Sequence, residues 1–161
     1  MGDHSETIQV DYDPTQISYA ELLDEFWDSH DPTARPYTEQ YASIIFYHNE
    51  EQKRLALETR DREASRRGGP LFTKVRSFSE FYLAEEYHQK YRLRQNLELL
   101  QDFLTIYPDS NGLLNSTAAA RVNGHLGGNG TLEVLRSQLD GLGLSVEGKE
   151  RLLDSVSAFG P

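Results

Sequence analysis

Residues 41–48 read Tyr-Ala-Ser-Ile-Ile-Phe-Tyr-His, an aromatic and β-branched run that predicts a largely buried strand. Asn49 is a good N-cap for a helix over about 50–66, and the Gly-Gly-Pro sequence at 68–70 ends that helix. Residues 72–78 alternate between apolar and polar side chains and predict a further strand. Strands that alternate with helices indicate an α+β or α/β fold.

Two elements are expected before this segment. Apolar side chains alternate with polar ones over residues 6–12, which is the period of a half-buried strand. Ser18 is a good N-cap for a helix of about three turns over 19–29, with an apolar stripe at helical spacing. Pro32 ends this helix, because a residue before proline avoids the helical region.

The pattern changes towards the C-terminus. A leucine-rich helical pattern begins at Ala84 and ends before Pro108; such a stripe is usually core, although it also suits a partner helix. Residues 109–131 are rich in Gly, Asn, Ser and Ala and predict a linker. Residues 131–139 and 146–156 predict two short amphipathic helices.

The charge balance limits the possible partners. The chain has 161 residues, with 16 Lys and Arg against 26 Asp and Glu, for a net charge of −10. We therefore expect no nucleic-acid partner, which needs a basic face, and no anionic membrane surface. No apolar run approaches the roughly 20 residues of a membrane span, and the N-terminus does not resemble a signal peptide. These features predict a soluble, cytoplasmic protein.

Cysteine is absent from the chain. Disulfides, thiolate metal sites and thiol nucleophiles are therefore excluded within these 161 residues. The five histidines show no close metal-ligand pair, so we predict no metal site.

Four groups of short motifs occur in order along the first ninety or so residues, and together they carry a resemblance. They are Gly-Asp-His-Ser-Glu at 2–6 with Tyr-Asp-Pro at 12–14; Ile-Ser-Tyr at 17–19 with Phe-Trp-Asp-Ser-His-Asp-Pro at 26–32; Gln-Tyr at 40–41 with Ser-Ile-Ile at 43–45; and Phe-Tyr-Leu-Ala-Glu-Glu-Tyr-His-Gln-Lys-Tyr at 81–91. Their spacing resembles that of the methionine sulfoxide reductase A family, the peptide-methionine (S)-S-oxide reductases. The Phe-Trp-x-x-His-Asp-Pro string is the most specific of them.

The resemblance implies an α+β fold with a mixed sheet, derived from the ferredoxin-like arrangement and flanked by helices. In this chain the sheet would be incomplete, and a helical C-terminal tail would follow it. The reductase-like domain would span 1–108, and a linker with a short helical tail would span 109–161. The resemblance implies an oxidoreductase that reduces methionine S-sulfoxide in peptides or proteins. This reaction repairs proteins under oxidative stress. It implies no bound cofactor, but an external thiol reductant such as thioredoxin or dithiothreitol.

Two residues occupy positions that the family uses in catalysis. Glu6 matches the acid that protonates the sulfoxide oxygen, although from the sequence alone it also fits a surface carboxylate. Tyr41 matches an active-site tyrosine, but it also fits a core aromatic residue of a strand.

Five residues match positions around the family's substrate pocket. His30 and Asp31 would shape one edge of the pocket, and Tyr82, Glu85 and His88 would lie at its rim. Their alternative interpretation is structural: a helix stop for the first two, and a helix N-terminus with packing for the other three.

The resemblance is incomplete in two places. The family's Gly-Cys-Phe-Trp-Gly motif, which carries the nucleophile, belongs upstream of Gly2. The family's loop with an active-site aspartate is replaced by a short loop at 33–40 that contains no Asp, where Glu39 is one candidate for a partial substitute. The chain alone is therefore predicted to be inactive.

Three interpretations follow. The first is an N-terminally truncated reductase. A selenocysteine codon misread as a stop would place the start of the chain at Met1. The nucleic acid upstream of Met1 would then encode Gly-x-Phe-Trp-Gly in frame. The second is a non-catalytic pseudoenzyme that binds a partner or oxidised methionine. The third is an unrelated α+β protein-interaction module.

Overall fold

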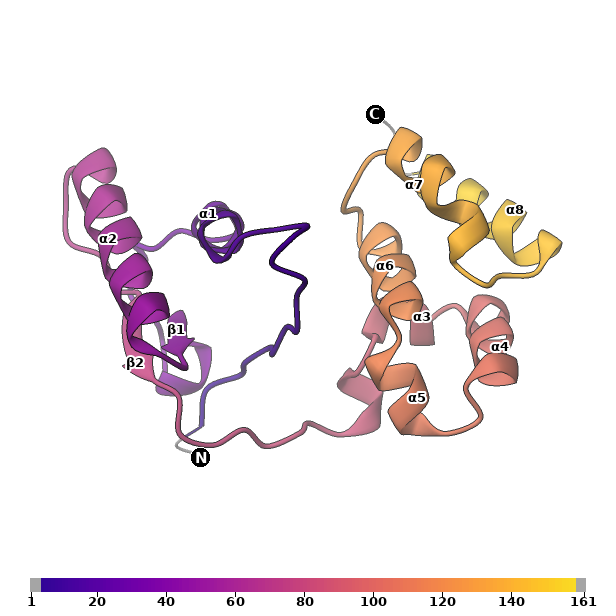
Figure 1. Cartoon of the computed structure of the whole chain (residues 1–161), viewed down its shortest axis with the longest axis horizontal. Coiled ribbons are helices and arrows are strands. Elements are labelled where there is room, and N and C mark those ends of the chain that lie inside the picture. Colours follow the sequence, from indigo (N-terminus) through magenta and orange to yellow (C-terminus); the bar gives the residue numbers. More distant parts are fainter. Residues whose placement is uncertain (1–3, 159–161) are drawn as a thin grey trace. The chain divides into compact units, whose positions relative to one another are not determined.

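The computed structural model describes residues 4–158, so Gly2 of the first motif lies outside the described residues. The chain divides into two compact units between Phe81 and Tyr82 (Figure 1). The domain limits proposed above, 1–108 and 109–161, concern the family resemblance and stay a prediction. The first unit contains α1 (Tyr19–Asp28), the short 3-10 helix η1 (Glu39–Tyr41), β1 (Ile44–Tyr47), α2 (Glu50–Arg67) and β2 (Lys74–Ser77).

The strand–helix–strand prediction is confirmed. β1 and β2 form a parallel pair in which Ile44 is opposite Lys74 and Tyr47 is opposite Ser77. The connection is α2, whose N-cap Asn49 accepts a hydrogen bond from the Gln52 backbone N–H at 2.9 Å. Both strands are shorter than the predicted runs, because only four residues of each take part in the pairing.

The core of the first unit lies between the two helices and β1. Its buried residues are Leu23 and Trp27 of α1, Ile45 of β1 and Ala56 of α2. In Figure 1, α1 is seen nearly end-on while α2 runs beside the strands. The predicted start of α1 is also confirmed, since Ser18 and Glu21 form a reciprocal capping box.

The strand predicted over residues 6–12 is wrong. This segment has no strand structure, and the side chains of Ile8 and Val10 are 86% and 56% exposed. A strand is stabilised by hydrogen bonds to a neighbouring strand. Within the described part of the chain, the sheet contains only β1 and β2, and the segment pairs with neither.

The second unit is helical. Its elements are η2 (Glu86–His88), α3 (Tyr91–Arg94), α4 (Leu97–Ile106), α5 (Ser110–Asn115), α6 (Thr117–Leu126), α7 (Leu132–Gln138), η3 (Leu139–Gly141) and α8 (Val146–Ser157). The fully buried side chains of its core include Leu93, Leu99, Phe103, Leu113, Val122, Leu135 and Leu152. The two predicted C-terminal helices are confirmed as α7 and α8.

The single helix predicted from Ala84 to Pro108 is wrong. Lys90 has φ +52°, a left-handed conformation that cannot continue a helix. Asn96 then caps α4. In α3, the backbone N–H groups of Arg92 and Leu93 donate to the side-chain oxygen of Asn123 in α6, at 2.9 and 3.2 Å. The leucine pattern correctly indicated helical structure with a buried face, but the points where the helices begin and end depend on these caps.

The linker predicted over 109–131 is also wrong for most of its length. Asp109 and Ser116 cap α5 and α6, and both helices bury apolar side chains in the same core. The described residues thus form a helix-rich fold with a small parallel sheet, compatible with the α+β class. No helix among residues 4–158 is long and apolar enough to cross a membrane.

Phe103→Ala is expected to lower the free energy of unfolding by about 3–5 kcal/mol, because the fully buried ring would leave a cavity. Leu97→Ala on the same helix is the matched control; Leu97 is 74% exposed, and its replacement is expected to change stability by about 0.5 kcal/mol or less. Urea denaturation followed by circular dichroism measures both. Equal losses would contradict the core assignment.

Candidate functional site

Three segments that are distant in sequence meet at the start of the parallel strand pair. Ser43 and Thr73 immediately precede β1 and β2, and the Lys74 N–H donates to the Ser43 carbonyl oxygen at 3.0 Å. The turn after α1 joins them, because the Phe72 N–H donates to the Pro32 carbonyl oxygen at 2.7 Å. Backbone hydrogen bonds therefore hold the three segments together.

These segments surround a pocket of about 250 Å³. The pocket is lined by His30, Asp31, Ala34, Arg35, Pro36, Tyr41, Ser43, Phe72 and Thr73. This volume is below that of sites for drug-sized ligands, and it suits one amino-acid side chain. The structure thus brings together three of the predicted site residues, namely His30, Asp31 and Tyr41.

His30 is held at both of its ring nitrogens. Its Nδ1 atom lies 2.8 Å from the Phe26 carbonyl oxygen, and its Nε2 atom lies 2.9 Å from the Thr73 hydroxyl. A carbonyl oxygen only accepts, so Nδ1 carries the hydrogen in the first contact. Neither nitrogen is free for a ligand, and this geometry favours the structural interpretation of His30, which fastens the turn after α1 to the segment before β2.

Asp31 is an anion in this pocket. Hydrogen bonds from the Thr33 hydroxyl at 2.6 Å and the Thr33 N–H at 2.9 Å lower the pKa of Asp31 below its ordinary value, and the charge of Arg67 lowers it further. At neutral pH the carboxylate accepts hydrogen bonds and does not donate one. Asp31 is therefore unsuited to protonate a bound oxygen.

Glu6 is hydrogen-bonded to Gln40, the residue before Tyr41, but Glu6 does not line the pocket. The Glu6 N–H donates to the Gln40 carbonyl oxygen at 3.0 Å, and the Gln40 side-chain amide donates to the Glu6 carboxylate at 2.9 Å. Tyr41 follows Gln40 in η1 and lines the pocket with its side chain 61% exposed. Tyr41 is thus not the core aromatic of the alternative interpretation.

Glu39 does not replace the family's aspartate in the pocket. Its carboxylate lies 2.6 Å from Lys74 Nζ and 2.8 Å from Arg76 Nη1, and it is not among the lining residues. The hydrogen bond from Lys74 is the main reason that the pKa of Glu39 is lowered. The carboxylate ties η1 to β2, and the expectation of a partial substitute is not supported.

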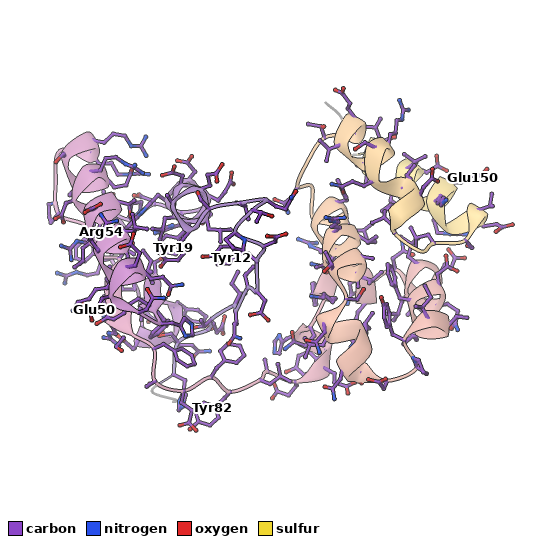
Figure 2. The ribbon with its side chains drawn as sticks, viewed as in Figure 1. Tyr12, Tyr19, Glu50, Arg54, Tyr82 and Glu150 are labelled. Atoms are coloured by element: carbon purple, nitrogen blue, oxygen red, sulfur yellow. The ribbon has the colours of Figure 1, made fainter. Side chains whose placement is uncertain are left out.

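Tyr82, Glu85 and His88 belong to the second unit, near its start. Figure 2 shows Tyr82 on the segment between β2 and η2. Glu85 precedes η2, and its carboxylate lies 3.8 Å from His88 Nε2, while the His88 ring lies 4.1 Å from the Tyr87 ring. Their role at a pocket rim stays a prediction.

Sequence reasoning missed four polar or aromatic residues of the pocket, namely Arg35, Ser43, Phe72 and Thr73. A signal was present for three of them. A strand, a helix and a strand in succession favour a parallel pair, whose strands begin at the same edge of the sheet. Ser43, Phe72 and Thr73 lie at those beginnings, so the pairing alone would have placed them together.

The lining combines several hydroxyl groups with an aromatic ring. The Tyr41 hydroxyl makes no hydrogen bond with another residue in 4–158, so it is available to donate to a bound oxygen. Phe72 contributes an apolar face. Among residues 4–158, no group of three or more His, Asp or Glu side chains is arranged to hold a metal ion. The lining therefore offers hydroxyl groups for hydrogen bonds and an aromatic ring for contact with an apolar group.

Comparison with known proteins points in the same direction. Residues 1–119 match the family model described as peptide methionine sulfoxide reductase. A peptide methionine sulfoxide reductase of Drosophila melanogaster is 42% identical over 147 residues, which cover 90% of this chain and 58% of that protein. The MsrA protein of Methanosarcina acetivorans is 46% identical over 96 residues, which cover 55% of this chain and 50% of that protein. Peptide methionine sulfoxide reductase A5 of Arabidopsis thaliana is 37% identical over 131 residues, which cover 78% of this chain and 51% of that protein. The chain spans about half the length of these curated relatives.

Thr33→Ala is expected to raise the pKa of Asp31 towards its ordinary value, because the hydroxyl makes the main hydrogen bond that lowers it. A lowered pKa stabilises the fold above the unfolded-state pKa of about 4, and this contribution is lost as the pH falls through the folded-state pKa. The variant should therefore lose less stability on acidification. Carbon-13 NMR titration of the Asp31 carboxyl group measures the shift.

Thr15→Ala is the matched control for this titration. Thr15 makes the same pair of hydrogen bonds to Asp13, whose pKa they also lower. Its replacement should raise the pKa of Asp13 and leave that of Asp31 unchanged. An unchanged Asp31 titration in Thr33→Ala would contradict the assignment.

Proposed function

The chain belongs to the peptide methionine sulfoxide reductase family, and from this premise we propose that its pocket binds the side chain of methionine S-sulfoxide for reduction by an external thiol. The observation that carries the proposal is the pocket at the start of β1 and β2, which Tyr41 lines. Glu6 does not line the pocket, but its carboxylate is hydrogen-bonded to Gln40, the residue before Tyr41. Membership of the family removes the third interpretation, an unrelated interaction module.

The proposed reaction starts when a thiolate attacks the sulfoxide sulfur. The S–O bond breaks as the oxygen is protonated; the products are methionine and a sulfenic acid, which a second thiol converts to a disulfide and water. The chain has no cysteine, so the thiolate must come from outside these 161 residues. Thioredoxin or dithiothreitol would supply the reducing equivalents.

The described residues would contribute to binding and to the movement of a proton. We assign to Glu6 the carboxylic acid that protonates the departing oxygen, and to Tyr41 a hydroxyl that donates a hydrogen bond to it. Phe72 offers an apolar ring for the methyl group of the substrate. His30 and Asp31 would hold the pocket in shape, since both ring nitrogens of His30 and the Oδ1 atom of Asp31 are already engaged.

The remaining expectations belong to the whole reductase. Tyr82, Glu85 and His88 would contact the peptide around the oxidised methionine, and the substrates would be oxidised-methionine peptides or proteins. The parallel β1–α2–β2 unit would be part of a larger, ferredoxin-like mixed sheet. Protein repair under oxidative stress, in the cytoplasm, is the process that fits this chemistry.

The second candidate function is a non-catalytic family member that binds oxidised methionine. The observation that favours it is the absence of cysteine, together with a pocket that is nevertheless present. Both candidates require recognition of the sulfoxide, and they differ in whether a thiolate from elsewhere is brought to the pocket.

The 161-residue chain is expected to show no turnover of a methionine-S-sulfoxide peptide with dithiothreitol, because no side chain in it replaces the thiolate. Chromatographic measurement of the reduced peptide, against a buffer blank, checks this expectation. Turnover above a blank that contains dithiothreitol but no protein would overturn the requirement for a protein thiolate, which these 161 residues do not supply.

Tyr41→Phe is expected to weaken binding of a methionine-S-sulfoxide peptide about two- to tenfold, the usual effect of losing one hydrogen bond. Tyr37→Phe is the matched control; Tyr37 lies on the same loop, is 95% exposed and does not line the pocket. NMR titration measures both, with the R-sulfoxide and unoxidised peptides for comparison. A chain that binds all three peptides equally would contradict the proposed function.

A further inference from the structure

Arg35 differs from the other arginines of the first unit. Each of the others has a carboxylate within 4.0 Å; they are Arg54, Arg60, Arg62, Arg66, Arg67 and Arg76. Arg35 has neither an ion pair nor a side-chain hydrogen bond with another residue in 4–158. Its guanidinium carbon lies 5.3 Å from the centre of the Phe72 ring.

The contact with Phe72 prepares Arg35 to bind an anion. A guanidinium group that lies against an aromatic ring has part of its surface covered, while the N–H groups at its edge stay available. The contact also restricts a flexible side chain, so less conformational entropy is lost when a ligand binds. A planar carboxylate is the ligand that matches the guanidinium edge best.

The backbone around Arg35 is restrained. The Ala34 N–H donates to the Asp31 carbonyl oxygen at 3.1 Å, and Pro36 has a φ angle limited by its ring. Phe72 is held by its backbone hydrogen bond to Pro32. Both partners of the cation–π contact are therefore placed by the same turn that shapes the pocket.

Asp31, the carboxylate that lines the pocket, is engaged at its Oδ1 atom. Asp31 accepts two hydrogen bonds from Thr33 and lies 4.0 Å from Arg67, and it makes no ion pair with Arg35. The charge of Arg35 is thus left for a ligand that enters from outside.

We propose that Arg35 forms a carboxylate subsite at the edge of the pocket, which favours methionine S-sulfoxide that has a carboxylate close by in the peptide. The carboxylate belongs either to an adjacent Asp or Glu side chain or to the C-terminus of the peptide. This inference rests on the proposed function, and it adds a specificity-determining residue to it.

The test uses the 161-residue chain and short peptides in an NMR or calorimetric titration. The peptides are acetylated and amidated and carry methionine S-sulfoxide beside Glu, Gln or Lys; a further Gln peptide with a free C-terminus isolates the terminal carboxylate. We expect the wild-type chain to bind the Glu peptide or the free-terminus peptide about five- to tenfold more tightly than the blocked Gln peptide, and the Lys peptide most weakly. The preference should shrink as salt is raised.

Arg35→Gln is expected to abolish this preference, so that the Glu peptide, the free-terminus peptide and the blocked Gln peptide bind to the variant within about twofold of one another. Arg54→Gln is the matched control, because it removes a charge from α2 that pairs with Glu51 and Glu58 and does not line the pocket. Thermal melting shows whether each variant is folded.

The outcomes separate the two ideas. If Arg35→Gln keeps the preference of the wild-type chain, or if the wild-type chain binds all four peptides equally, the subsite is refuted, whatever the S-sulfoxide preference shows. If the wild-type chain prefers carboxylates but does not distinguish S-sulfoxide from unoxidised methionine, the subsite stands and the proposed function fails.

Discussion

The parallel pairing of β1 with β2 is the constraint on which the first unit depends. Parallel strands cannot be joined by a tight hairpin, so the chain must cross over, and α2 does so with 18 residues. Both strands begin at the same edge, and the segments before them are drawn together there. A register shift of one residue would also move Ile45 out of the core, so the core and the pocket depend on the same hydrogen bonds.

Ion pairs connect this pair of strands and its helix to the turn after α1. Glu63 of α2 is 5% exposed and accepts hydrogen bonds from Arg66 and Arg67, and the Arg66 contact is the main reason that its pKa is lowered. Arg67 also reaches the Trp27 carbonyl oxygen at 3.4 Å and lies 4.0 Å from Asp31. A buried carboxylate requires such partners. The C-terminal end of α2 therefore helps to position the turn that carries His30 and Asp31.

The helices of the second unit are short, so side chains that cap their ends satisfy a large share of their backbone N–H groups. The side chains that cap them are Asn96, Asp109, Ser116, Thr131 and Ser145. Asp102 of α4 accepts hydrogen bonds from the backbone and hydroxyl of Ser145, which joins the start of α8 to α4. Apolar spacing indicated that these residues form helices around one core, but the helix ends follow from caps that include contacts distant in the sequence.

The sequence by itself determined the local elements whose signals are contiguous: the capping box at Ser18, the apolar run around Ile45, of which only Ile45 is buried in β1, and the helix with Gly68 as its C-cap. It also determined the family, through motifs that span the chain from Glu6 to Tyr91, and the absence of any thiol. Only the tertiary structure decided that residues 6–12 stay unpaired and that Lys90 interrupts the long helix. The pocket around Tyr41 and the position of Arg35 against Phe72 were likewise decided by tertiary contacts. The physical reason is that a strand, a buried cap or a pocket exists only when a partner distant in the sequence supplies the other half of the contact, and local spacing does not encode that partner.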